Sequence, residues 1–222
     1  MTQADWSAVD DYIAGHLLGD DPVLDAVLQA NATAGLPAID VSAVQGKMLH
    51  LLALGTGARR ILEVGTLGGY STIWLARALP EGGHLVTLEL DPHHAEVACA
   101  NLCRAGMADK VEVRVGPAVE ALDAMIAGGE APFDFIFVDA DKEGYPDYLS
   151  AAMRLSRPGT MIVFDNVVRE GGILDPNHPD PRVQGTRALF EAMAAEPRLS
   201  ATAVQTVGAK KWDGFALALV TS

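Results

Sequence analysis

The sequence predicts an α/β protein built on one mostly parallel, doubly wound sheet that ends in an antiparallel hairpin. Two observations lead to this fold class. From Arg59 onward, short apolar runs alternate with helical segments, and such runs, bounded by turn residues, are typical of parallel strands covered on both faces. The last two runs are separated only by Gly208 to Gly214, which leaves no room for a crossover helix. We therefore expect seven strands with helices on both faces of the sheet.

The expected elements follow in chain order. Strands are predicted over residues 60–64, 84–90, 111–115, 133–139, 160–165, 200–206 and 215–220, and the helices between them over residues 70–79, 92–105, 119–126, 145–155 and 183–195. Residues 5–18 and 22–34 show helix-period apolar positions, with a stop and restart at Asp20-Asp21-Pro22. Ser42 can cap a further helix that ends at Gly55.

Domain organisation is predicted to be simple. No linker rich in Gly, Ser or Pro follows the N-terminal helices, so residues 1–57 are interpreted as a helical extension of a single domain whose core spans residues 58–222. Half of the 222 residues are hydrophobic and 20% are charged, which allows a large buried core.

Charge and hydropathy exclude several partners. The net charge of -13 counts against binding to nucleic acid or to an anionic membrane. No uncharged run of transmembrane length occurs, and the N-terminus lacks the basic start of a signal peptide. We expect a soluble cytoplasmic protein. Cys99 and Cys103 are expected to be buried, reduced packing residues, and His93 and His94 to lie at the surface.

The segment EVGTLGGYS, residues 63–71, follows the first strand of the alternating part. Glycines in such a turn let a ligand approach the backbone, and the next helix offers free N–H groups at its start. The glycine spacing breaks the G-x-G-x-x-G fingerprint of dinucleotide-binding proteins. Glu63 just before the turn suits a ligand with an ammonium group, such as the methionine end of S-adenosylmethionine.

A second acid, Glu89, lies at the tip of the second strand, where a carboxylate can accept hydrogen bonds from both ribose hydroxyls. Asp91 precedes Pro92 and is expected to cap the next helix instead. Ala118 follows the third strand and leaves room for an adenine edge, although an ordinary turn explains it nearly as well. A glycine turn alone is often only a tight connection. The turn together with Glu63 and Glu89 favours S-adenosylmethionine.

Acidic and amide side chains follow two further strands that are expected to be neighbours. Asp139 ends one strand, and Asp165 and Asn166 end the next. Carboxylate and amide oxygens are hard ligands suited to Mg²⁺. The alternative is that each Asp caps a following helix. Lys142 near a bound cation is a candidate general base, and its alternative is a solvated lysine paired with Asp141 or Glu143.

These motifs resemble those of the cation-dependent O-methyltransferases, which include the catechol and caffeoyl-coenzyme A O-methyltransferases. The resemblance covers the chain from about Ile39 and is carried by VSAVQGKML (41–49), EVGTLGGYS (63–71), TLELD (87–91), FDFIFVDADK (133–142) and IVFDNV (162–167). It implies the Rossmann-like fold of class I methyltransferases, for which the terminal antiparallel hairpin is typical.

The resemblance also implies roles for individual residues. It places Val41 against the cofactor and Ala118 at the adenine, with Glu89 on the ribose. It assigns the methionine end to Glu63, Gly65, Thr66 and Ser71, and Gly69 and Tyr70 lie in the same cofactor-binding segment. It makes Asp139, Asp165 and Asn166 metal ligands and Lys142 the base, with Asp139 next to both metal and cofactor. The implied reaction is methyl transfer to a phenolic oxygen of a small vicinal diol, and the implied assembly is a homodimer.

Three other functions remain open from the residues alone. One is a metal-independent methyltransferase with Asp139 as the base, and another is a cofactor-binding protein without catalysis. A nicotinamide-dependent dehydrogenase would share the sheet, but the glycine spacing and the hairpin oppose it. A nucleic-acid or amino-group methyltransferase is disfavoured because the fourth strand lacks an Asn-Pro-Pro-Tyr type of motif. Residues 168–181, together with the N-terminal helices, are expected to shape the acceptor pocket.

Overall fold

The computed structural model describes residues 2–222. Its strands are β1 (Arg60–Val64), β2 (His84–Glu89), β3 (Val111–Val115), β4 (Phe135–Val138), β5 (Met161–Asp165), β6 (Leu199–Gly208) and β7 (Lys211–Val220). Its α-helices are α1 (Gln3–Leu17), α2 (Pro22–Thr33), α3 (Ala43–Gly55), α4 (Tyr70–Ala76), α5 (Pro92–Arg104), α6 (Ala118–Ala127), α7 (Tyr145–Arg154) and α8 (Pro181–Ala195). Two 3₁₀ segments, η1 (Lys142–Gly144) and η2 (Arg169–Leu174), complete the elements.

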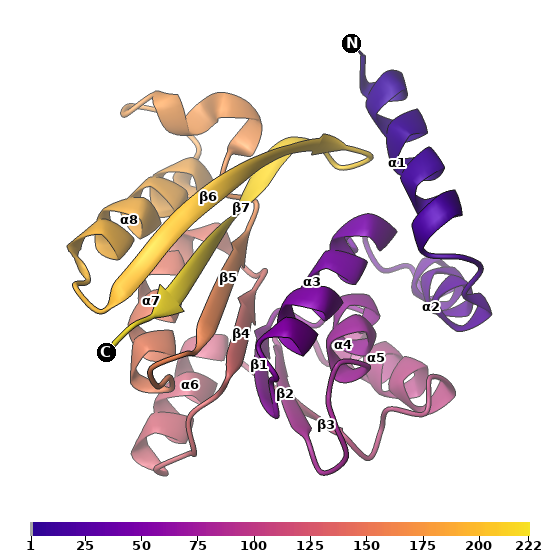
Figure 1. Cartoon of the computed structure of the whole chain (residues 1–222), viewed down its shortest axis with the longest axis horizontal. Coiled ribbons are helices and arrows are strands. Elements are labelled where there is room, and N and C mark those ends of the chain that lie inside the picture. Colours follow the sequence, from indigo (N-terminus) through magenta and orange to yellow (C-terminus); the bar gives the residue numbers. More distant parts are fainter. Residues whose placement is uncertain (1) are drawn as a thin grey trace.

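The strands form one seven-stranded sheet in the order β3-β2-β1-β4-β5-β7-β6 (Figure 1). β1 to β5 pair in parallel, whereas β7 runs antiparallel to β5 and β6 antiparallel to β7. The predicted fold class is confirmed, including the terminal hairpin and the adjacency of β4 and β5.

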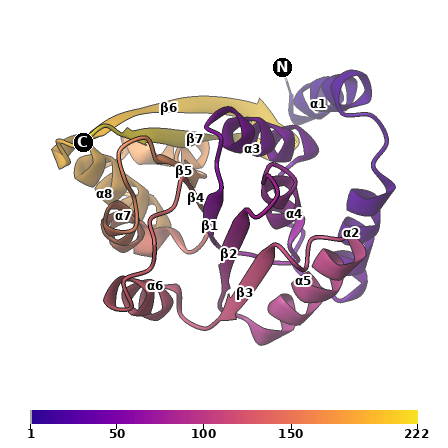
Figure 2. The ribbon, with the colours of Figure 1, turned by 60° about the horizontal axis from the view of Figure 1, so that its bottom comes forward.

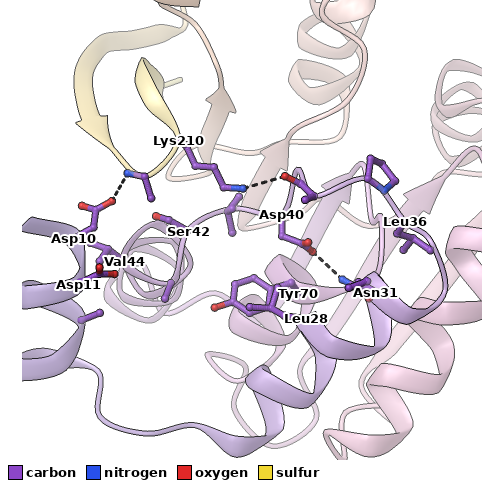
Figure 3. A pocket seen from close by; sticks show the side chains of 17 residues that line it. Asp10, Asp11, Leu28, Asn31, Leu36, Asp40, Ser42, Val44, Tyr70 and Lys210 are labelled. Atoms are coloured by element: carbon purple, nitrogen blue, oxygen red, sulfur yellow. Dashed lines mark hydrogen bonds between the residues drawn. The ribbon is translucent and has the colours of Figure 1, made fainter. Parts of the chain in front are cut away.

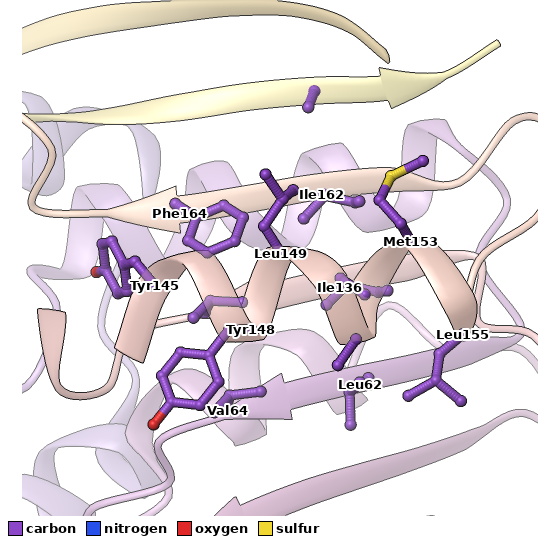
Figure 4. Packing of buried hydrophobic residues seen from close by; sticks show 14 of the residues in the cluster. Leu62, Val64, Ile136, Tyr145, Tyr148, Leu149, Met153, Leu155, Ile162 and Phe164 are labelled. Carbon is purple, nitrogen blue, oxygen red and sulfur yellow. The ribbon is translucent and has the colours of Figure 1, made fainter. Parts of the chain in front are cut away.

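Helices cover both faces of this sheet (Figure 2). Alternate residues of each strand face opposite sides, so Leu62 and Val64 of β1 join the cluster under α6, α7 and α8, while Ile61 joins the cluster under α3, α4 and α5. Figure 4 shows the first cluster, in which Leu149 and Met153 of α7 lie over β4 and β5. Both faces are apolar because both are covered, which explains the nearly continuous apolar strands of the sequence.

The predicted start signals of three helices are confirmed. The Asp21 carboxylate accepts the Leu24 N–H at 3.1 Å ahead of α2, and the Ser42 hydroxyl accepts the Gln45 N–H at 3.2 Å ahead of α3. Asp91 caps α5. The Ser42 cap also marks where the segment that connects α2 to α3 ends.

The hairpin is longer than the sequence predicts. Only Ala209 and Lys210 separate β6 from β7, and Trp212 and Asp213, expected in a loop, pair with β6 in the ladder. The polar character of this stretch suggested a loop. This part of β7 pairs with β6 alone, because β5 pairs only with residues 215–219 of β7, so the sheet does not cover it as it covers the central strands.

The prediction of buried cysteines is wrong. Cys99 and Cys103 are both free and exposed. The buried face of α5 consists of Ala95, Ala98, Asn101 and Leu102. Cys99 and Cys103 directly follow the buried residues Ala98 and Leu102. Successive residues of a helix point about 100° apart around its axis, so both cysteines point away from the buried face.

Helix α1 lies at the periphery of the molecule (Figure 1) and has no buried residue. It meets the hairpin tip, where Gln3 Nε2 donates to the Gly208 carbonyl at 2.8 Å and Asp10 accepts the Ala209 N–H at 2.8 Å. Within residues 2–222, no helix is sufficiently long and apolar to cross a bilayer.

Candidate active site

The predicted site residues gather where the parallel strands end. β1, β2, β4 and β5 run in the same direction, so their carboxyl ends meet at one edge of the sheet. In open α/β sheets this edge is where ligands bind. The glycine turn follows β1, Glu89 ends β2, Asp139 follows β4 and Asp165 ends β5.

The glycine turn is pressed against the end of β4. Gly65 has a φ of +99°, and a Cβ added there would lie 2.0 Å from the main-chain oxygen of Asp139. A Cβ on Gly68 would meet the Asn31 side chain at 2.0 Å. Gly69, with a φ of 84°, begins α4 in the left-handed region. The turn therefore needs glycine because protein backbone and side chains approach it closely, and its contact with a ligand stays a prediction.

Glu63 is fully buried and surrounded by hydroxyl groups. Ser71 Oγ donates to Oε1 at 2.7 Å, and Thr87 Oγ1 donates to Oε2 at 2.7 Å, where Thr72 also donates. Burial raises the pKa of the Glu63 carboxyl to about 7, and these hydrogen bonds oppose the rise. Glu63 thus fastens the first turn of α4 to β1 and β2, a role that sequence reasoning did not assign to it.

Glu89 supports the turn from the side of β2. One carboxylate oxygen accepts the N–H groups of Thr66 at 3.1 Å and Leu67 at 2.8 Å, and the other accepts the Asp91 N–H at 2.9 Å. The side chain is 8% exposed. Glu89 and Thr66, both predicted to bind the cofactor, are therefore in direct contact, although their predicted cofactor contacts remain to be tested.

Lys142 is paired with the first metal-ligand candidate. Its Nζ donates to Asp139 Oδ1 at 2.6 Å, and the lysine is only 8% exposed. The alternative of a solvated lysine paired with Asp141 or Glu143 is wrong. Asp141 instead caps η1 by accepting the Gly144 N–H at 3.0 Å.

Asp165 is only 5% exposed, and it ends β5 beside the end of β4, which Asp139 directly follows. Its carboxylate accepts the Asn166 N–H at 2.8 Å and Gln45 Nε2 at 2.7 Å, both neutral donors. Burial, and next the Asp139 charge, raise the pKa of the Asp165 carboxyl to about 7. The raised pKa reflects a buried carboxyl that lies near a second carboxylate and has no cationic hydrogen-bond partner among the described residues.

The donor types of these residues are those that a hard divalent cation prefers. Asp139, Asp165 and Asn166 supply two carboxylates and an amide, and neither Asp caps a helix. Residues 2–222 contain no group of three or more His, Cys, Asp and Glu side chains placed to hold a metal. The predicted set has only two carboxylates, so the remaining positions would fall to the Asn166 amide, water and substrate.

A pocket of about 370 Å³ lies beside the turn (Figure 3). It is formed by α1, α2, the segment before α3 and the hairpin tip, and it is lined by two predicted cofactor residues, Val41 and Tyr70. Both are buried, at 8% and 3% exposure. The charged residues of its otherwise mostly apolar lining are Asp10, Asp11, Asp40 and Lys210. Ala118, at the start of α6, lies outside this pocket.

Sequence reasoning missed several residues that organise the site. Gln45 lies within the motif VSAVQGKML, but nothing in that motif indicates a bond to a residue 120 positions away. Asp213 accepts the N–H groups of Val168 and Arg169 at 2.9 and 3.0 Å and so anchors the segment after Asn166 to β7. Asp213 was read as loop, so no signal pointed to this contact.

Comparisons with known proteins show to which family this chain belongs. A family model described as O-methyltransferase matches residues 16–219. The chain belongs to the O-methyltransferase family. This O-methyltransferase is 56% identical over 212 residues to a catechol O-methyltransferase of Mycobacterium tuberculosis, covering 96% of this chain and 94% of the relative.

Two further comparisons give the same result. A catechol O-methyltransferase of Niastella koreensis is 50% identical over 220 residues, covering 99% of this chain and all of the relative. The solved O-methyltransferase of Bacillus cereus, a complex with SAH, superposes with a TM-score of 0.98 at 55% identity and covers 99% of this chain and 100% of that one. The protein is an S-adenosylmethionine-dependent O-methyltransferase.

Proposed function

We propose that this O-methyltransferase methylates a hydroxyl of a small catechol-like acceptor with the help of a divalent cation, most suitably Mg²⁺. The observation that carries the proposal is Asp165. It is a buried carboxylate beside Asp139 that has only neutral hydrogen-bond donors and no cationic partner of its own among residues 2–222. The relatives named catechol O-methyltransferase support the choice of acceptor.

S-adenosylmethionine supplies an electrophilic methyl group, and a bound divalent cation acidifies and orients the two oxygens of a vicinal diol. Asp139, Asp165 and Asn166 would hold the cation at the ends of β4 and β5. The turn from Gly65 to Ser71, with Glu89, would hold the cofactor, and Val41 would lie against it.

Lys142 would take the proton from the acceptor hydroxyl. Its Nζ is bound to Asp139 Oδ1 at 2.6 Å, and an ammonium group in that pair has no lone pair to accept a proton. A cation on Asp139 would compete for the same oxygen and release Nζ, and its positive charge would favour loss of the ammonium proton to solvent. The neutral amine so formed would have the lone pair that accepts the hydroxyl proton. Lys142→Met should therefore lower kcat by about 10²-fold or more while leaving cofactor affinity unchanged.

The deciding experiment is an assay of catechols and hydroxycinnamoyl thioesters with S-adenosylmethionine, with Mg²⁺ and after treatment with EDTA. We expect methylation of vicinal diphenols only with the metal. Activity that survives EDTA would favour the metal-independent alternative with Asp139 as base. Failure to methylate any ortho-diphenol under every metal condition would exclude the catechol proposal.

We also propose that the protein forms a homodimer. All residues from 200 to 207 of β6 are exposed on both faces of the strand, and α1 buries nothing. Val204 and Val207 are 43% and 52% exposed, and such apolar edge strands invite pairing. Light scattering on wild-type protein should give twice the chain mass, and Val207→Lys should lower it. Val115→Lys, on the opposite edge strand, should leave it unchanged.

A further inference from the structure

Gln45 forms a bond between the N-terminal helices and the end of β5. Its Nε2 donates to Asp165 Oδ2 at 2.7 Å, although the two residues are 120 positions apart. Gln45 lies in the first turn of α3, where its own N–H is capped by the Ser42 hydroxyl at 3.2 Å. The cap and the side-chain bond together fix the position of this turn against the sheet.

The position of α3 itself is held by close packing. A Cβ added to Gly46 would lie 2.3 Å from the Trp74 ring of α4. Helix α3 can therefore pack this closely against α4 only with glycine at position 46. Because Gly46 directly follows Gln45, this contact sets how far the Gln45 amide reaches toward Asp165.

The Asp165 carboxylate is fixed at both oxygens. Oδ1 accepts the N–H of Asn166 at 2.8 Å, and Oδ2 accepts Gln45. The main-chain oxygen of Asp165 also accepts the Tyr145 hydroxyl at 2.6 Å. Each carboxylate oxygen has two lone pairs, so one direction on each oxygen stays free for another partner.

The side-chain donor to Asp165 is the neutral amide of Gln45, whereas the side-chain donor to Asp139 is charged. Asp139 is already paired with the ammonium of Lys142. A second ammonium or guanidinium at position 45 would neutralise Asp165 and compete with a divalent cation for its oxygens. An amide orients the carboxylate and leaves its negative charge available.

We propose that Gln45 is a positioning residue that orients Asp165 for the divalent cation, an inference that rests on the proposed metal site. Partners that orient a metal ligand typically change metal affinity by about 10- to 100-fold when removed. Gln45 does this from a helix that also follows directly on Val41, so one capped turn would place both the metal ligand and the wall of the cofactor site.

The test is Mn²⁺ binding by the whole chain, followed by the loss of the free-ion electron paramagnetic resonance signal. Gln45→Leu removes the donor at similar volume, and Gln45→Met does the same with an unbranched, flexible side chain in case the first variant does not fold. Gln29→Leu, an exposed residue of α2, is the matched control. Thermal unfolding without metal and S-adenosylmethionine binding without metal are measured on every variant.

We expect the Mn²⁺ Kd to rise about 10- to 100-fold in Gln45→Leu and Gln45→Met, with cofactor affinity and the metal-free unfolding midpoint near those of wild type. Gln29→Leu should bind Mn²⁺ as wild type does. A Kd within twofold of wild type in both Gln45 variants overturns the inference while the metal site stands. Absence of Mn²⁺ binding by wild type overturns the metal site and the inference together.

Discussion

At the scale of single residues, Glu63 illustrates how one side chain can serve the fold beneath a ligand site. Its carboxylate is fully buried, and it holds hydroxyls of α4 and β2 at the base of the glycine turn. The sequence showed that an acid precedes the turn. It did not show that Thr72 and Thr87 would surround it, because they come from different elements that only the tertiary structure brings together.

Glu63 should make stability depend on pH. Its pKa is raised from 4.5 to about 7 in the folded chain, so the folded state binds the proton more tightly than the unfolded state does. Its contribution to stability is complete below pH 4.5 and is lost as the pH rises through about 7, a decline of about 3 kcal/mol. Urea unfolding at pH 5 and pH 8 should show a clearly smaller decline in Glu63→Gln than in wild type. An equal decline in both proteins would contradict this assignment.

Gly65 should not tolerate a side chain. A Cβ would overlap the Asp139 main chain, and the φ of +99° is strained for any other residue. We expect Gly65→Ala to lower the free energy of unfolding by about 2 kcal/mol or more and to weaken S-adenosylmethionine binding, both measured on the same preparation. Gly106→Ala is the control, because it has a φ of +67° but open space at the Cβ. Equal effects at both positions would mean that the backbone strain of a positive φ accounts for the loss, without a contribution from the overlap with Asp139.

At the scale of elements, a buried amide chain joins the N-terminal helices to the glycine turn. Asn101 Nδ2 of α5 donates to the Gly68 carbonyl at 2.8 Å and to Asn31 Oδ1 of α2 at 2.9 Å. Asn31 Nδ2 then donates to Asp40 at 2.9 Å. Both asparagines are at least 98% buried, so α2 and α5 hold the turn at Gly68, whereas Glu89 holds it at Thr66 and Leu67.

Removing the centre of this chain should loosen the turn. Asn101→Ala leaves the Gly68 carbonyl and the Asn31 amide oxygen without their buried donor, which costs about 2 kcal/mol. Urea unfolding should show this loss, and calorimetry should show weaker S-adenosylmethionine binding. Asn177→Ala, at an exposed asparagine, should change neither quantity. Wild-type cofactor affinity in a destabilised Asn101→Ala would show that the chain supports the fold but not the turn.

The elements also show which features the sequence could reveal. Parallel strands, helix caps and strand-end acids were predictable because they depend on local periodicity and short motifs, as at Ser42 and Asp165. The contacts of Gln45, Asn101 and Asp213 were not, because a polar residue in a helix or strand does not indicate which distant element it meets. The face of α5 was misjudged for the same reason, since its packing against α2, β2 and β3 together decides which side is buried.

At the scale of the whole molecule, stability should be distributed unevenly. The central strands β1 and β4 are buried along almost their entire length, whereas α1 and β6 bury no residue. Local opening costs least where few apolar contacts are lost. In a monomer, α1 and β6 should therefore exchange amide hydrogens long before the central strands do.

Hydrogen exchange at low and high protein concentration therefore tests the proposed homodimer without any mutation. If a second copy covers these elements, amides of α1 and β6 should become more protected as concentration rises, because association stabilises the covered state by mass action. Amides of β1 and β4 should stay equally slow at both concentrations, which makes them the internal control. Fast exchange in α1 and β6 at every concentration would show that these surfaces stay uncovered and would contradict the homodimer. Protection at every concentration would instead indicate a dimer that remains intact on dilution, and light scattering at the lowest concentration would then have to give twice the chain mass.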